Sequence, residues 1–176
     1  LNGVLEWVGT LEEKRDPLDV QIDALNKLRN KLKYRGYLYL AIENRYGISY
    51  ILGQRDPHSG LRFSSVLPRK VANLYCKFMK GKSYRVYTYS YPALSKILKI
   101  AGFCDIHFFY PAPHYHLPLY LLPLDDKNVW DYFLDSISFR NSLKREISYW
   151  GAKIINALNL RSASAITFGI VARKSQ

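Results

Sequence analysis

The chain has 176 residues and a net charge of +12, and 48% of its residues are hydrophobic. A chain of this length and apolar content forms one domain with a sizeable core, which excludes an intrinsically disordered protein. Two cysteines, Cys76 and Cys104, exclude a disulfide-rich secreted scaffold and indicate a reducing, cytoplasmic compartment, and no apolar run has the length of a membrane span.

The first part of the chain predicts a strand, a helix and a second strand. Residues 1–5 are mostly apolar and lead into a loop, as at the end of a strand. A helix is predicted over residues 17–34, with Asp16 as its cap and Gly36 just beyond its end. The apolar run 37–43 then predicts a strand that is buried on both faces, as in a parallel sheet.

Polar residues lie at the carboxyl end of that second strand, where open α/β sheets bind their ligands. They are Glu43, Asn44, Arg45 and Tyr46. A carboxylate and an amide at this place could hold a substrate hydroxyl, and Arg45 could face a phosphate or a carboxylate. Asn44 could equally serve only to form the turn.

The middle of the chain is strongly basic. The predicted elements there are a glycine-containing loop over 45–67, helices over 68–79 and 90–101, and a strand over 103–110. From Pro57 to Cys104 nine residues are basic and none is acidic. This composition favours an anionic partner such as a phosphorylated substrate, a nucleic acid or an acidic membrane surface; the alternative is an ordinary solvated surface.

The last part of the chain begins with a proline-rich segment, 111–123, whose four prolines exclude a central strand and a helix interior. The elements predicted after it are a helix capped by Asp125 or Asp126, a helix over 139–158 and a strand over 163–172. We expect the apolar face of the second helix to pack against the sheet, and docking on an acidic membrane is the alternative. That face consists of Phe139, Leu143, Ile147, Trp150 and Ile154.

Four phrases in this order resemble the C-terminal half of a class I S-adenosylmethionine-dependent methyltransferase domain. They are residues 2–8, residues 32–38 running into Ile42-Glu43-Asn44, Thr88-Tyr89-Ser90 before a helix, and Ala101-Gly102-Phe103 before a strand. The resemblance implies an α/β fold, the C-terminal part of a Rossmann-like sheet with flanking helices. Its strands would lie near 1–5, 37–43 and 103–110, with an antiparallel strand at 163–172.

Some parts of the family pattern are missing from this sequence. The glycine-rich turn that would hold the methionine part of the cofactor and the acidic residue that would bind its ribose do not occur, and Tyr34 and Arg35 replace the usual proline and glycine. We therefore expect residues 1–176 to be a single, incomplete methyltransferase domain that lacks its N-terminal cofactor-binding half. On its own it should neither bind the cofactor tightly nor methylate.

The resemblance also implies a set of binding residues. The cofactor, S-adenosylmethionine, would be lined by Asn2, Gly3, Leu5 and Glu6. The acceptor would be a small molecule or glycan, with a hydroxyl on a sugar-like or phosphorylated group. It would be contacted by Glu43, Asn44, Arg45 and Tyr46, with Tyr115 in the wall of the cleft.

Methylation of a hydroxyl requires a proton acceptor, and the long loop supplies a candidate. His58, oriented by Asp56, would be the general base, although Asp56-Pro57-His58 could also be an exposed turn. His114 and His116 lack further ligands, so no metal site is expected. The alternative function is a non-catalytic basic module that binds nucleic acid or an acidic membrane surface, which would place the protein at the membrane periphery; a scaffold half that pairs with another subunit is a third hypothesis.

Overall fold

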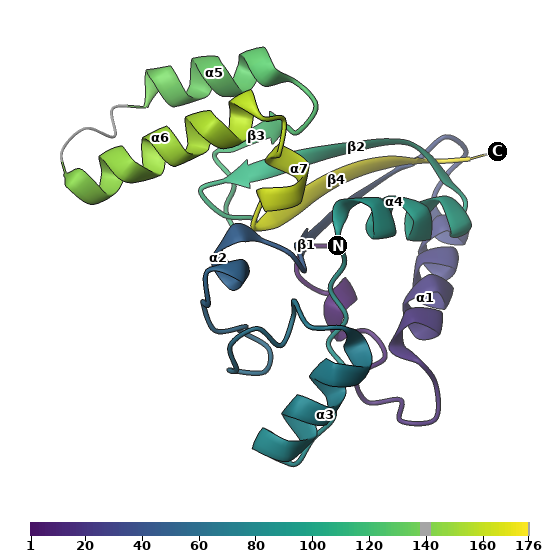
Figure 1. The fold of residues 1–176 in the computed structure, drawn as a ribbon. Coiled ribbons are helices and arrows are strands. Elements are labelled where there is room, and N and C mark those ends of the chain that lie inside the picture. Colours follow the sequence, from purple (N-terminus) through teal and green to yellow (C-terminus); the bar gives the residue numbers. More distant parts are fainter. Residues whose placement is uncertain (138–141, 176) are drawn as a thin grey trace.

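A four-stranded sheet forms the centre of the molecule in the computed structural model, which describes residues 1–137 and 142–175 (Figure 1). The strands, in their order across the sheet, are β1 (Tyr37–Glu43), β4 (Thr167–Lys174), β2 (Phe103–Ala112) and β3 (Tyr120–Pro123). The helices are α1 (Pro17–Lys31), α2 (Ile48–Ile51), α3 (Arg69–Lys80), α4 (Tyr91–Ile100), α5 (Lys127–Ser136), α6 (Leu143–Ala157) and α7 (Arg161–Ser164). The predicted mixed α/β class is therefore confirmed.

All three strand pairs of this sheet are antiparallel, which corrects the parallel sheet expected around residues 37–43. Because β4 lies between β1 and β2 and runs against both, β1 and β2 run in the same direction. The antiparallel orientation that was expected of the last strand is confirmed, but β4 begins at Thr167 rather than at residue 163, since residues 161–164 form α7. β3 lies at the edge of the sheet, the position that a proline-containing strand can occupy.

The chain start runs beside β1 in parallel, as expected, but over a shorter length. Asn2 pairs with Ala41 in an isolated parallel bridge, in which Gly3 donates to the Ala41 carbonyl and Ala41 donates to the Leu1 carbonyl, both at 2.9 Å. Gly3 then adopts a φ of +63°, and a single 3-10 turn, Leu5–Trp7, follows. The predicted strand over residues 1–5 is therefore a single bridge and a turn.

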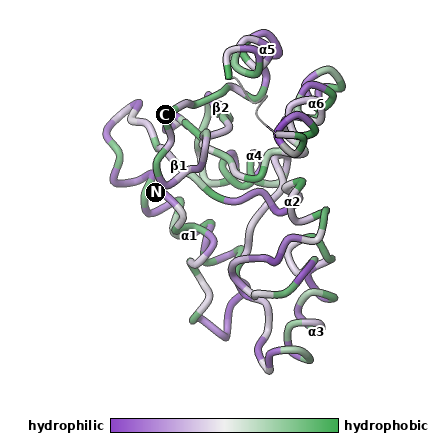
Figure 2. Tube along the Cα trace, turned by 90° about the vertical axis from the view of Figure 1, so that its left-hand side faces the viewer, coloured by the Kyte–Doolittle hydropathy of each residue, from purple (hydrophilic) through white to green (hydrophobic). Residues whose placement is uncertain are grey.

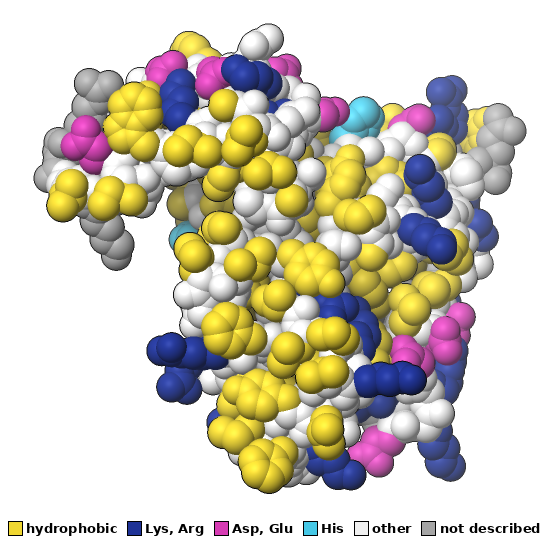
Figure 3. Space-filling view, viewed as in Figure 1, with side chains coloured by type: hydrophobic (Ala, Val, Ile, Leu, Met, Phe, Trp, Pro, Cys, Tyr) yellow, Lys and Arg dark blue, Asp and Glu magenta, His cyan; other side chains and the backbone are white. Residues whose placement is uncertain are grey.

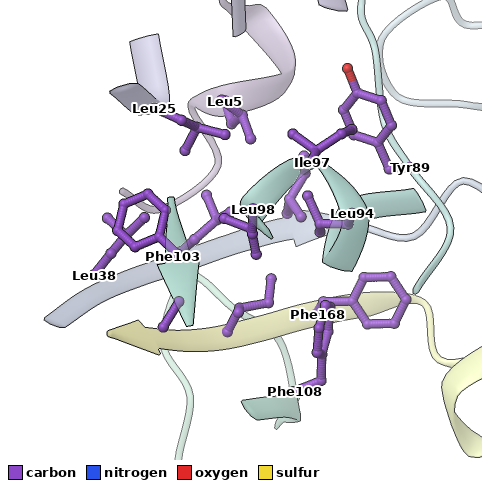
Figure 4. Packing of buried hydrophobic residues seen from close by; sticks show 14 of the residues in the cluster. Leu5, Leu25, Leu38, Tyr89, Leu94, Ile97, Leu98, Phe103, Phe108 and Phe168 are labelled. Atoms are coloured by element: carbon purple, nitrogen blue, oxygen red, sulfur yellow. The ribbon is translucent and has the colours of Figure 1, made fainter. Parts of the chain in front are cut away.

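The main core lies between the sheet and the two helices α1 and α4 (Figure 4). Asp16 caps α1 by accepting from the Leu18 amide, as predicted, and the helix ends at Lys31 rather than at residue 34. Within α1, Gln21 is fully buried, and its side chain donates to the Leu5 carbonyl at 2.8 Å. This hydrogen bond joins α1 to the turn that follows the first bridge. The fully buried side chains include Leu5, Leu25, Leu40, Ile42, Leu94, Leu98, Phe168 and Ile170.

The expectation that helix 139–158 packs its apolar face on the sheet is wrong for the residues that the structure describes. α6 contacts α5 through its polar face, where Lys153 lies 2.8 Å from Asp135 and Asn156 donates to Asp131 at 2.9 Å. The apolar face points to solvent: Leu143, Ile147, Trp150 and Ile154 are 57–76% exposed. Phe139 lies outside the described residues. None of the helices in the described part of the chain is long and apolar enough to cross a membrane.

The hairpin of α5 and α6 and the helix α3 lie at opposite ends of the molecule, with the sheet between them (Figures 1 and 2). α3 belongs to a smaller second core that it forms with the loop before it. Leu61, Ala72, Cys76 and Tyr84 are the buried members of this core.

Candidate functional site

Side chains from three separate segments meet beside the carboxyl end of β1. Glu6 comes from the turn after the first bridge, Glu43 is the last residue of β1, and His58 comes from the long loop. One ligand-type atom of each lies within 4.8 Å of those of the other two. Because the first segment and β1 are parallel neighbours, their ends reach the same edge of the sheet, and this brings the two carboxylates together.

Glu43 and His58 form a direct pair inside this cluster. Nε2 of His58 lies 2.5 Å from Oε2 of Glu43, and both side chains are almost fully buried. Burial lowers the pKa of His58, but the hydrogen bond and charge of Glu43, with the charges of Asp56 and Glu6, together raise it by more, so the net pKa is above its ordinary value of 6.5. Trp7 packs edge-on against the imidazole at 5.0 Å, and the Tyr115 hydroxyl donates to Oε1 of Glu43 at 3.3 Å.

Glu6 is 1% exposed, and neither of its carboxylate oxygens has a hydrogen-bond partner among the described residues. Burial raises its pKa to about 7, with a further contribution from the nearby charge of Glu43. A carboxyl group with this pKa can hold or release a proton near neutral pH. Groups of this kind are concentrated at functional sites.

The carboxylate that orients the imidazole is Glu43 and not Asp56, which corrects the expected pair. Asp56 is 1% exposed and accepts from the backbone N–H of His58 at 3.2 Å and from the hydroxyls of Ser59 at 2.8 Å and Ser64 at 3.0 Å. It therefore fixes the path of the loop that carries His58. The loop is ordered by this network rather than being an exposed turn.

Tyr115 closes the other side of the cluster by packing on the chain start. A Cβ on Gly3 would come within 2.9 Å of the Tyr115 ring, so only glycine fits at this position without movement of the ring. Asn2 donates from its side chain to the Tyr115 carbonyl at 3.0 Å. Of the four residues predicted to line the cofactor, Asn2, Gly3 and Glu6 thus border this region, whereas Leu5 is fully buried in the main core.

The polar groups of Asn44 and Arg45 are occupied by the protein itself. Asn44 is 1% exposed, donates to the carbonyls of Ala163 and Ala165, and accepts from the Tyr46 amide. Arg45 donates through Nε to the Ser65 carbonyl at 2.8 Å. Both residues hold the turn after β1 in place, and their predicted contacts with an acceptor stay predictions.

One hollow borders the cluster at His58, a second lies between α1 and α4, and cations line both. A cavity of about 360 Å³ is bordered by His58, Cys76, Lys80, Lys82 and Tyr84. A groove of about 460 Å³ between α1 and α4 has an apolar floor and carries Arg45, Tyr46, Arg69 and Lys96. No acidic side chain lines either hollow among the described residues.

The cluster also has the chemistry of a cation site. Glu6, Glu43 and His58 would supply two oxygens and one nitrogen, a donor set that divalent transition metals accept, and the unpartnered oxygens of Glu6 would gain a partner. The histidine of this cluster is His58, whereas His114 and His116 are the histidines considered as metal ligands from the sequence.

Comparison of the chain with family models, with curated proteins and with solved structures finds no match. The site therefore has to be interpreted from its own geometry. Sequence reasoning missed the pairing of Glu43 with His58, the contact of Trp7 and the role of Ser64. The one sequence feature that could have pointed to them is the density of polar residues in 54–65, which is unusual for a plain turn.

Proposed function

We propose that this chain is the C-terminal portion of a class I S-adenosylmethionine-dependent methyltransferase that acts on a hydroxyl group. The observation that carries the proposal is the convergence of Glu6 and Glu43, from the ends of two parallel neighbours, with His58 at one buried site. The pairing of the chain start with β1 and the antiparallel last strand are both what the resemblance requires. The Rossmann-like identity of the sheet belongs to this proposal as well.

His58 is the group that would accept the proton of the acceptor hydroxyl. In the neutral imidazole, Nε2–H donates to Glu43, and this leaves the lone pair on Nδ1 for the proton. Nδ1 is buried and has no hydrogen-bond partner among the described residues, so an acceptor hydroxyl can reach it only if the surrounding side chains move. Glu43 then stabilises the imidazolium that forms, in the same way that it raises the pKa of His58.

S-adenosylmethionine supplies an electrophilic methyl group on a sulfonium when it is bound. With the cofactor held beside Asn2, Gly3 and Glu6, that methyl group would pass to the acceptor oxygen, and His58 would take up the proton that the hydroxyl gives up. Most of the rate of such an in-line displacement comes from positioning. Gly3 and Asn2 contribute by fixing Tyr115, whose hydroxyl holds Glu43.

The cavity beside His58 favours a phosphorylated acceptor. Lys80 and Lys82 line it, are exposed, and have no ion pair among the described residues. The third cation of this cavity, Arg85, already donates to the carbonyls of Gly9 and Glu12 and so has a structural task. The two lysines are therefore free to bind a phosphate.

The test is a calorimetric titration of S-adenosylhomocysteine into the natural protein, including any residues that precede Leu1. We expect saturable binding, and His58→Gln should leave that affinity within about twofold while it lowers methyl transfer to a sugar phosphate by about 10²–10⁴-fold. Asp56→Asn is not a suitable control because it releases the loop. Asn128→Ala, at an exposed position of α5, is the control and should change neither quantity. Absence of heat with both S-adenosylmethionine and S-adenosylhomocysteine would contradict the proposal.

A further inference from the structure

α3 has an apolar face that the rest of the described chain does not cover. Val71, Leu74 and Phe78 recur at the spacing of one helix face, and they are 48%, 71% and 87% exposed. The opposite face is buried through Ala72 and Cys76, so α3 is anchored and its apolar face is held outward. In Figure 3, hydrophobic side chains gather at the end of the molecule where Figure 1 places α3, with Lys and Arg at their border.

A row of lysines runs beside this apolar face. Lys70 and Lys77 are seven residues apart and precede Val71 and Phe78 directly, so they form one edge of it. Both are exposed and neither has an ion pair among the described residues. No acidic residue occurs from Pro57 to Cys104, so nothing near in sequence neutralises them.

We propose that α3 docks the protein on an anionic membrane surface, with Leu74 and Phe78 inserted among the acyl chains and Lys70 and Lys77 among the acidic headgroups. An exposed apolar helix face with lysines along its edge is the arrangement by which a helix lies in a bilayer interface. The apolar part gains by leaving water, and the lysines gain by contact with negative headgroups. This inference does not depend on the proposed methyl transfer.

Other occupants fit the same surface less well. A second copy of α3 would bring lysine rows together with no carboxylate between them, and like charges would oppose that contact. A nucleic acid would bind the lysines but would leave Phe78, at 87% exposure, in water. Only a surface that is both acidic and apolar uses every feature of this helix.

The exposed face of α6 differs from α3 in charge and supplies a matched control. Leu143, Ile147 and Ile154 are as exposed as the apolar residues of α3. Residues 125–157, which include the hairpin of α5 and α6, however contain five acidic and five basic residues, so this stretch has no net charge. Acidic headgroups would therefore attract it less than α3, and nothing in the structure shows what covers it.

The test is co-sedimentation of the natural protein with vesicles of phosphatidylcholine alone or with about 30% phosphatidylglycerol. We expect the anionic vesicles to bind at least about tenfold more strongly, and binding should fall by at least about tenfold when salt is raised to about 0.5 M. Lys70→Glu with Lys77→Glu, and separately Leu74→Ser with Phe78→Ser, should each weaken binding by about tenfold or more. Ile147→Ser with Ile154→Ser should leave it within about twofold.

Insertion has its own readout. In Phe78→Trp, the fluorescence of the new tryptophan should shift to shorter wavelength with anionic vesicles and not with a soluble polyanion such as heparin. If the lysine variants lose binding while the Leu74 and Phe78 variants keep it, the ligand is a polyanion and the proposal is wrong. Equal binding to both vesicle types, or loss of binding in the α6 control, would overturn it as well. Circular dichroism of each variant establishes that it is folded.

Discussion

Nε2 of His58 lies 2.5 Å from Oε2 of Glu43, although the two residues are 15 positions apart in the chain. Glu43 stands at the end of β1 and His58 in an irregular loop, so their contact fixes the loop against the sheet. The loop is held from its other side by Asp56, which accepts hydrogen bonds from Ser59 and Ser64. The position of the imidazole is thus fixed both by its hydrogen bond to Glu43 and by the hydrogen bonds of Asp56 within the loop.

Replacement of Glu43 by Gln should lower the pKa of His58. In the native protein burial lowers this pKa, whereas the hydrogen bond and charge of Glu43, together with the charges of Asp56 and Glu6, raise it, so removal of the Glu43 charge takes away the largest raising contribution. The expected result is a lower His58 pKa than in the native protein, measured by NMR titration of the imidazole protons. Glu13→Gln, at an exposed position, is the control and should leave the titration of His58 unchanged. An unchanged His58 would show that Glu43 does not bind it.

Glu6 should make the protein less stable as pH rises from about 5 to about 7. Its pKa is raised from 4.5 to about 7 on folding, so in this range the unfolded chain releases the proton while the folded chain keeps it. The free energy of unfolding then falls with pH, in total by about 3 kcal/mol for a shift of this size. Below the unfolded pKa both states are protonated and the effect vanishes.

Urea denaturation at pH values of about 4.5, 6 and 8 measures this effect, and Glu6→Gln should abolish it. The raised pKa of His58 adds a loss of the same sign at higher pH, because its stabilisation is present below 6.5 and disappears as pH rises through its folded pKa. The difference in pH dependence of the free energy of unfolding between the native protein and Glu6→Gln therefore gives the contribution of Glu6 alone. Glu13→Gln, at an exposed position, is the control and should keep the native pH dependence. A Glu6→Gln protein with that same dependence would contradict the assignment.

Most of the fold follows from local features of the sequence. Asp16 before Pro17 starts α1, Gly81 and Gly102 follow the ends of α3 and α4, and Asp126 caps α5. These elements could be predicted because each depends on residues within one or two helical turns. The exposure of the apolar face of α6 could not be predicted in this way, because a periodic pattern identifies which residues are apolar but not what covers them.

The start of β4 illustrates a boundary that depends on distant residues. The sequence predicts a strand that begins at Ala163, yet residues 161–164 form α7. Arg161 is 3% exposed and donates to the Leu124 carbonyl at 2.9 Å and to Oδ1 of Asn156 at 2.6 Å. The partners lie in other segments, so no local pattern announces the turn.

The candidate site was predictable in part. That Glu6 and Glu43 approach each other follows from two adjacent parallel segments whose ends share an edge. That His58 joins them does not, because the loop returns to the sheet through the hydrogen bonds of Asp56 and Ser64 rather than through any regular structure. For this reason the sequence indicates Asp56, a near neighbour in the chain, as the partner of the imidazole.

Replacement of Asn44 by Ala should destabilise the protein rather than weaken binding of an acceptor. The side chain donates to two carbonyls at 3.0 and 2.7 Å and accepts from the Tyr46 amide at 3.0 Å, all at a residue that is 1% exposed. Loss of these bonds leaves buried polar groups without partners, which should cost about 3 kcal/mol in the free energy of unfolding. Asn128→Ala, at an exposed position of α5, should cost less than about 0.5 kcal/mol. A native stability in Asn44→Ala would instead support a role in binding.

Replacement of Gly3 by Ala should cost more stability than the same replacement at Gly81. Both glycines have positive φ, +63° and +70°, a conformation in which alanine is disfavoured by about 1–2 kcal/mol. At Gly81 a Cβ would meet nothing within 4 Å, whereas at Gly3 it would lie 2.9 Å from the Tyr115 ring. The excess cost of Gly3→Ala, measured by urea denaturation, therefore reports the energy needed to move Tyr115. Since the Tyr115 hydroxyl binds Glu43, that movement should also change the NMR titration of His58, and Gly81→Ala should leave it as it is. Equal stability losses together with an unchanged His58 would show that Tyr115 does not depend on Gly3 for its place in the site.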